Sequence, residues 1–159
     1  MDMSRIVTVD MILKNNPCRR FSHRSDLMRW SRNKESLTLE EVLQLAINVE
    51  DKIWVLTLPE VMLIAERLEF VQKLATLVRE SRCRIMTYLP AGYNPDEFES
   101  AIERLESGET AGYRQNLMFQ CYMDTFNVLS TEYALRHNVY PEDYEAIYDQ
   151  MILEMLVSL

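Results

Sequence analysis

Apolar side chains recur every three or four residues over most of this chain, a spacing that places them on one face of an α-helix. Helix-starting residues and breaks divide the pattern into eight predicted helices. One begins at Thr38, and the others cover about 8–15, 25–32, 50–57, 60–83, 95–107, 111–136 and 141–158. The pattern therefore predicts an all-α fold, a compact bundle of seven or eight helices with no sheet of consequence.

Several helix starts carry a capping signal. Thr38 and Glu41 have the spacing of a capping box, in which a hydroxyl accepts from the amide three residues on and a carboxylate accepts from the cap amide. Ser25 is predicted to cap the second helix. Pro59 is predicted near the first position of the long helix at 60–83, where a missing amide hydrogen costs nothing.

The same spacing predicts which residues of the longer helices face the core. In the helix at 60–83 they are Ile64, Leu68, Val71, Leu74, Ala75 and Val78. In the helix at 111–136 they are Leu117, Cys121, Phe126 or Met123, Leu129 and Tyr133. In the last helix they are Tyr144, Ile147, Tyr148, Met151, Met155 and Leu156. We find no convincing internal repeat and predict a single domain.

Charge is distributed unevenly along the 159 residues, which carry a formal net charge of −8. Residues 1–84 contain 14 Lys+Arg and 12 Asp+Glu, whereas residues 85–159 contain 3 and 13. The composition changes at 90–95, where two of the five prolines and one of the three glycines lie. We therefore predict a basic-to-neutral helical half at 1–89, a linker at 90–95 and an acidic helical half at 96–159.

Composition also excludes some classes of protein. Three glycines are too few for β-rich folds, phosphate-binding loops or dinucleotide-binding loops, which need glycine for tight turns and close backbone approach. Cys18, Cys83 and Cys121 are odd in number and widely spaced, which is typical of reduced thiols. No leader pattern and no apolar run of membrane-spanning length is present, so we expect a cytoplasmic protein without a membrane partner.

Candidate catalytic chemistry is weak. The only two histidines, His23 and His137, have no neighbours at metal-ligand spacing, so we predict no metal and no cofactor. Cys18 near His23 is a conceivable thiol–imidazole pair, but a structural cysteine and a surface histidine are favoured. Acids such as Glu99 and Glu103 are better explained as a solvated helix face than as acid–base catalysts. We predict that the chain is not an enzyme, and keep a small enzyme using Cys18 or these acids as the weakest alternative.

A basic segment at 19–34 is a candidate phosphate-binding surface. Its arginines are Arg19, Arg20, Arg24, Arg29 and Arg32. Arginine suits phosphates through its planar fork, and Trp30 could stack on a base. The sequence pI of about 4.8 opposes this interpretation, because nucleic-acid-binding modules are usually basic overall. A nucleic-acid-associated protein is therefore our second hypothesis.

The acidic half is a candidate surface for a protein partner. Its acids and flanking tyrosines are Asp96, Glu97, Glu99, Glu103, Glu106, Glu109, Tyr93 and Tyr113. Carboxylates favour a basic partner, and tyrosine supplies rigid amphipathic contact area. All eight tyrosines of the chain lie within residues 85–159. A merely solubilising acidic surface is the competing interpretation.

The first eighty residues also resemble short modules of uncharacterised phage and mobile-element proteins. The residues that carry the resemblance are Val7–Leu13, Asn16–Cys18, Trp30, Glu35–Leu43 and Glu50–Leu56, and the last helix, Tyr144–Leu156, resembles the closing helix of such proteins. The chain departs from them after Pro90, where alanine-rich helices are absent. The resemblance implies a small helical fold and a mobile-element setting, and it transfers no catalytic residue.

Together these observations predict a non-enzymatic phage or mobile-element protein that binds and blocks or modulates a host protein complex, for example a defence system. The acidic, tyrosine-containing surface is the predicted contact, and the host cytoplasm is the predicted location. Homodimerisation through an exposed apolar helix face is a further hypothesis.

Overall fold

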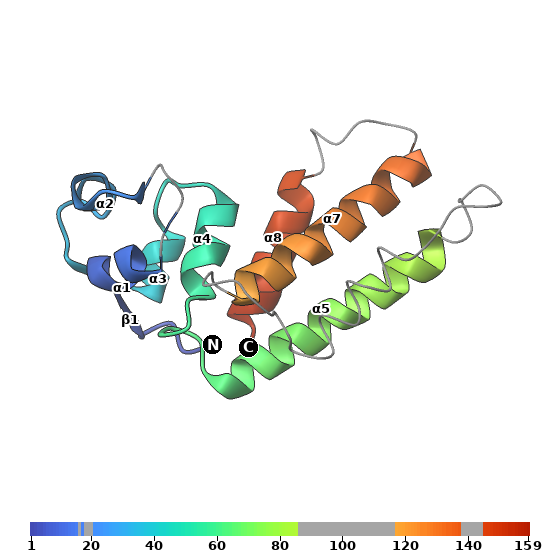
Figure 1. The fold of residues 1–159 in the computed structure, drawn as a ribbon, viewed down its shortest axis with the longest axis horizontal. Helices are drawn as coiled ribbons and strands as arrows, with labels where there is room; N and C mark the ends of the chain where they lie inside the picture. The colour runs from blue at the N-terminus through green and yellow to red at the C-terminus, as the bar shows by residue number, and fades with distance from the viewer. Residues whose placement is uncertain (16, 18–20, 86–116, 138–144) are drawn as a thin grey trace.

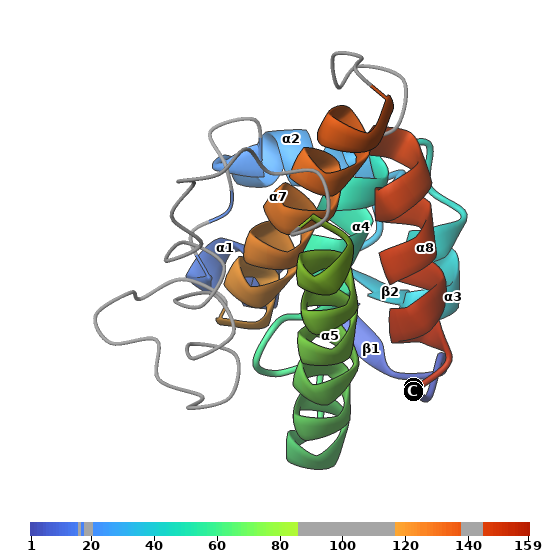
Figure 2. The ribbon, with the colours of Figure 1, turned by 90° about the vertical axis from the view of Figure 1, so that its right-hand side faces the viewer.

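The computed structural model describes residues 1–15, 17, 21–85, 117–137 and 145–159. In these residues it contains seven α-helices and one two-stranded sheet (Figures 1 and 2). The elements are β1 (Ile6–Thr8), α1 (Val9–Lys14), α2 (Arg24–Trp30), β2 (Ser36–Thr38), α3 (Leu39–Leu43), α4 (Val49–Leu56), α5 (Ile64–Ile85), α7 (Leu117–His137) and α8 (Glu145–Val157). The predicted linker at 90–95 and the predicted helix at 95–107 lie outside the described residues.

The mostly helical fold is confirmed, and the structure adds a small two-stranded sheet to the predicted helices. Strands β1 and β2 pair antiparallel, with Val7 opposite Leu37 at the centre of the register. Both central side chains are buried, at 2% and 6% exposure. Each strand is only three residues long, so its alternation of exposed and buried positions is too short to stand out against the helical pattern.

The two strands belong to two similar strand–helix units. The Thr8 hydroxyl accepts from the amide of Met11 at 3.1 Å and caps α1, and the Thr38 hydroxyl accepts from the amide of Glu41 at 3.1 Å and caps α3. The first amide of each helix also bonds to the chain just before the other strand. Val9 donates to the Glu35 carbonyl and Leu39 to the Arg5 carbonyl, both at 3.0 Å. The units are therefore related by an approximate two-fold arrangement about the centre of the sheet.

This arrangement reveals a short internal repeat that the sequence analysis missed. Residues 6–13 read Ile-Val-Thr-Val-Asp-Met-Ile-Leu, and residues 36–43 read Ser-Leu-Thr-Leu-Glu-Glu-Val-Leu. The shared pattern is apolar, threonine, apolar, acid, any residue, then two apolar residues. The corresponding apolar residues are buried in both copies: Val9 and Ile12 in the first, Leu39 and Val42 in the second. Eight residues with few identities fall below what a search by eye detects.

We predict that both threonine caps stabilise the fold. Thr8→Ala and Thr38→Ala are each expected to lower the free energy of unfolding by about 1 kcal/mol, because each leaves a helix amide without its acceptor. Thr38→Ala should have the larger effect, since Glu41 completes a capping box there. Thr76→Ala, on the exposed face of α5, is the matched control and should change stability little. Equal effects of all three variants in urea denaturation would contradict this account.

Helix α2 packs against α1, whereas α4, α5, α7 and α8 pack with one another. Helix α5 packs mainly against α7, and α8 packs against both α7 and α4. Helices α5 and α7 run side by side in the same direction (Figure 1). Arg84 near the end of α5 pairs with the buried carboxylate of Glu132 on α7, at 2.5 Å from Nε to Oε1. The Tyr122 hydroxyl on α7 donates to Asp149 on α8 at 2.5 Å.

The core register of α5 differs from the prediction at its start. Leu74, Ala75 and Val78 are buried as predicted, but Ile64 and Leu68 are 75% and 62% exposed. The side chain that fills the core near the start of this helix is Phe70, with 0% exposure. The helix also begins at Ile64 rather than beside Pro59, because residues 59–61 form a turn.

Two smaller predictions also need correction. Helix α2 is capped by His23 rather than Ser25, and the His23 side chain makes no cap hydrogen bond. On α8 Leu156 is buried as predicted, but Ile147 is 60% exposed, and Ile152 and Leu153 are buried instead.

On α7 the predictions for Cys121 and Leu129 are confirmed, since both are buried.

Candidate interaction surfaces

The predicted acidic surface cannot be placed in the fold. Its residues, Tyr93, Asp96, Glu97, Glu99, Glu103, Glu106, Glu109 and Tyr113, all lie outside the described residues. Cys18 also lies outside the described residues, as do Arg19 and Arg20 of the basic segment. The surface that the sequence favours for a partner therefore stays a prediction from charge and tyrosine content.

The described part of the basic segment is engaged with acids of its own fold. Arg24 at the start of α2 reaches Asp10 on α1 at 2.6 Å and Glu35 before β2 at 2.5 Å, one with each terminal nitrogen. The hydrogen bond to Asp10 is the main reason why the pKa of Arg24 is raised. Arg29 lies 3.9 Å from Asp26 on the same helix and has a side chain that is 85% exposed.

The turn after α2 presents two further basic residues. Arg32 and Asn33 both have left-handed backbone angles, with φ of 56° and 63°, and this reverses the chain between α2 and β2. Lys34 pairs with Glu41 at 2.5 Å. A shallow hollow of about 160 Å³ beside the turn is lined by Ser31, Arg32, Lys34, Leu37, Glu41 and Gln44. Basic side chains here are interleaved with acids rather than gathered into one positive face.

A different surface emerges at the start of α5. Leu63, Ile64 and Leu68 are 57%, 75% and 62% exposed and follow one another within two helical turns. We call these three residues the aliphatic patch. The sequence analysis had placed Ile64 and Leu68 in the core, so this surface was not anticipated. Large aliphatic side chains that lie together in water favour contact with another apolar surface.

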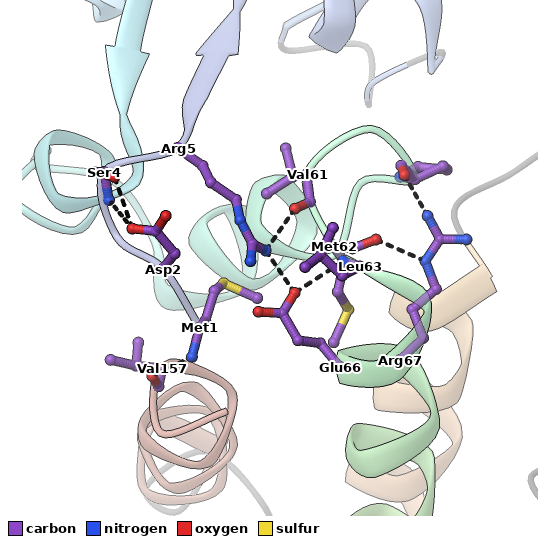
Figure 3. Close-up of polar contacts among 11 residues, drawn as sticks. Met1, Asp2, Ser4, Arg5, Val61, Met62, Leu63, Glu66, Arg67 and Val157 are labelled. Atoms are coloured by element: carbon purple, nitrogen blue, oxygen red, sulfur yellow. Dashed lines mark hydrogen bonds and ion pairs between the residues drawn. The ribbon is translucent and has the colours of Figure 1, made fainter.

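Polar contacts hold the backbone under the aliphatic patch in place (Figure 3). Arg5, just before β1, donates to the Glu66 carboxylate at 2.5 Å and to the Val61 carbonyl at 3.1 Å. The same carboxylate accepts from the amide of Leu63 at 2.8 Å, which caps the start of α5. Glu66 is 8% exposed, so this bridge between the first strand and α5 is largely shielded from water.

The turn before α5 is fixed by further bonds. Arg67 donates from Nε to the Met62 carbonyl at 3.0 Å and from a terminal nitrogen to the Pro59 carbonyl. Glu60 accepts from Lys14 at 2.8 Å and from the Asn15 side-chain amide at 2.9 Å, which ties the turn to α1. The start of α5 is thus attached to the strand–helix units at two separate points.

The two carboxylates of this region ionise more readily than usual. Burial opposes ionisation of Glu66, but the hydrogen bonds from Arg5 and from the Leu63 amide outweigh it and lower the Glu66 pKa. The hydrogen bond from Lys14 is the largest cause that lowers the pKa of Glu60. Both carboxylates are therefore charged partners at neutral pH.

Other chemistry in the described residues is sparse. His137 stacks against Tyr133 with ring centroids 4.2 Å apart, at the exposed end of α7. Cys83 is exposed and Cys121 is buried. In the ranges given above, no group of three or more His, Cys, Asp or Glu side chains could hold a metal ion. Within the same ranges, none of the helices has the length and apolarity needed to cross a membrane.

Comparison with protein-family models, with curated proteins and with solved structures found no match to this chain. The resemblance to phage and mobile-element modules accordingly depends on the quoted sequence patterns alone.

Proposed function

We propose that this chain is a non-enzymatic interaction protein of a phage or other mobile element, which binds and blocks or modulates a host protein complex in the cytoplasm. The contact is assigned to the acidic residues between Tyr93 and Tyr113. A host defence assembly with a basic surface is one partner of this kind.

The distribution of charge carries the proposal. Arg24 uses both terminal nitrogens on Asp10 and Glu35, and Lys34 is paired with Glu41, so these two basic residues of the segment at 19–34 are balanced by acids of the same fold. Residues 85–159 have 13 acids against 3 bases. An excess of one charge sign raises the rate of association with a partner of the opposite sign and suppresses wrong partners.

The same contacts speak against the nucleic-acid hypothesis, which keeps Arg19, Arg20, Arg24, Arg29 and Arg32 as its residues. A phosphate backbone would have to compete with Asp10 and Glu35 for Arg24, and would meet the nearby acids. A salt-dependent gel shift that disappears when these arginines are changed to glutamine would favour nucleic acid. Absence of any shift at low salt is the outcome that our proposal expects.

Affinity capture with charge-reversal variants tests the proposal. We expect the tagged chain to capture one host protein or complex, and the variant D96K/E99K/E103K/E106K to lose most of it, because the reversed side chains repel a basic partner. The matched control reverses four acids outside this region, E40K/E50K/E69K/E80K, and should retain the partner. Equal capture by both variants would remove the acidic surface from the account.

A further inference from the structure

Helix α2 is attached to the rest of the described fold by few side chains. Leu27 is fully buried, and Met28 and Trp30 are partly buried. Helix α4, which is only one residue longer, fully buries three side chains. Among the described elements, α2 packs mainly against α1, and it lies at the edge of the molecule, away from α5 (Figure 1). Separation of α2 would therefore bring little apolar surface into water.

The two ends of α2 add little to its stability. The His23 side chain at its start makes no cap hydrogen bond, whereas Thr8 and Thr38 cap α1 and α3. At its other end the chain reverses through Arg32 and Asn33, whose left-handed backbone angles favour glycine over arginine. A helix of seven residues does not persist in water by itself. Its formation therefore depends on contacts with the neighbouring elements.

The packing beneath α2 is incomplete. A small cavity of about 10 Å³ lies between α2, α1 and the sheet, and its lining includes Leu27, Trp30, Ile12, Val7 and Leu37. Side chains that border a cavity lose part of their packing contacts, which weakens their attachment. The Nε1–H group of Trp30 is also buried without an acceptor among the described residues, and an unmade hydrogen bond opposes docking of the helix.

Arg24 attaches α2 to both strand–helix units. One terminal nitrogen contacts Asp10 on α1 and the other contacts Glu35 just before β2. The three side chains are 48%, 78% and 60% exposed, so both ion pairs lie in water. Exposed ion pairs are screened by salt and contribute modestly to stability. The polar attachment of α2 is therefore sensitive to ionic strength.

We propose that α2 is a lid, held closed by Arg24, which opens as a unit while the rest of the described fold stays intact. Opening breaks both ion pairs, withdraws Leu27 and exposes the apolar side chains around Val7 and Leu37. The lid is thus a salt-sensitive device that controls exposure of this apolar face. The acidic residues between Tyr93 and Tyr113 take no part in it, so failure of this inference leaves the proposed function unaffected.

Native-state amide hydrogen exchange of the full chain tests the lid directly. We expect protection factors at Leu27–Ser31 to be at least about tenfold lower than those at Ile53–Thr57 of α4. Their dependence on urea should be shallower, because opening of α2 exposes less surface than global unfolding does. Raising NaCl from about 0.05 M to 1 M should lower the protection of α2 about threefold, because salt screens the ion pairs of Arg24.

R24Q and R29Q are the matched variants. Both replace an arginine of α2 by glutamine, but Arg29 lies 3.9 Å from Asp26 of the same helix and so does not connect α2 to α1 through this pair. R24Q is expected to lower the protection factors of α2 about three- to tenfold and to remove most of the salt effect, whereas R29Q should change them less than about twofold.

Three results would overturn the inference. Equal protection and equal urea dependence of α2 and α4 would show that both belong to one cooperative unit. Equal effects of R24Q and R29Q, or an undiminished salt effect in R24Q, would show that Arg24 does not hold the lid closed. The comparison of α2 with α4 is made in the unchanged chain, so it does not depend on the folding of either variant.

Discussion

Replacing Phe70 with alanine is expected to lower the free energy of unfolding by about 3–5 kcal/mol, the range observed when a buried aromatic ring is removed. Phe70 has 0% exposure on α5, and the space it leaves cannot be filled without moving the neighbouring helices. Urea denaturation of F70A against the unchanged chain measures this loss.

The neighbouring L68A variant is the control for this prediction. Leu68 is 62% exposed, so its removal should cost less than about 1 kcal/mol. Comparing F70A with L68A tells which face of α5 is buried, because the sequence pattern placed Leu68 in the core and omitted Phe70. If L68A proved the more damaging variant, the helix would be rotated relative to the structure described here.

The second large effect is expected from the bridge between the first strand and α5. Arg5→Met should destabilise the fold by about 1–3 kcal/mol, because it leaves the largely buried Glu66 carboxylate without its charged partner. Glu69→Gln breaks an exposed pair with Lys73 on the same helix and should cost less than about 0.5 kcal/mol. Similar losses in both variants would show that the Arg5–Glu66 pair contributes no more than a surface contact.

The same bridge makes stability depend on pH. The pKa values of Glu66 and Glu60 lie below the ordinary 4.5 in the folded chain, so their ionised forms stabilise the fold. This stabilisation is complete above the ordinary value and is lost as the pH falls through the lowered folded values. We therefore expect acid unfolding to begin below about pH 4.5, with a shallower pH dependence in Arg5→Met. An unchanged profile in that variant would show that Glu66 is not the responsible group.

The sequence predicted what depends on local spacing. The capping box of Thr38 and Glu41 appears as expected, since it involves only residues three apart. The helices at 9–14 and 49–56 lie within one residue of their predicted bounds, and α7 and α8 end at His137 and Val157, each within one residue of the predicted end. The sheet was missed because its two strands are 30 residues apart in the chain and each is too short to produce a period of its own.

The start of α5 shows why the candidate surfaces were harder to predict. Ile64, Leu68 and Val71 fit a helical stripe as well as Phe70, Leu74 and Val78 do, and hydrophobicity alone does not say which stripe meets a neighbour. The burial of the second stripe comes from α7, which packs against α5, and the position of Glu66 is fixed by Arg5, 61 residues away in the chain. Such long-range contacts leave no periodic signal.

We propose that the acidic residues between Tyr93 and Tyr113 bind a protein partner. The most direct test of this proposal is calorimetric titration of the purified captured partner with the unchanged chain and with D96K/E99K/E103K/E106K. We predict that the variant binds at least about tenfold more weakly, and that added salt weakens binding of the unchanged chain, as expected when opposite charges meet at an interface. Equal affinity of the two proteins, with no effect of salt, would contradict the account.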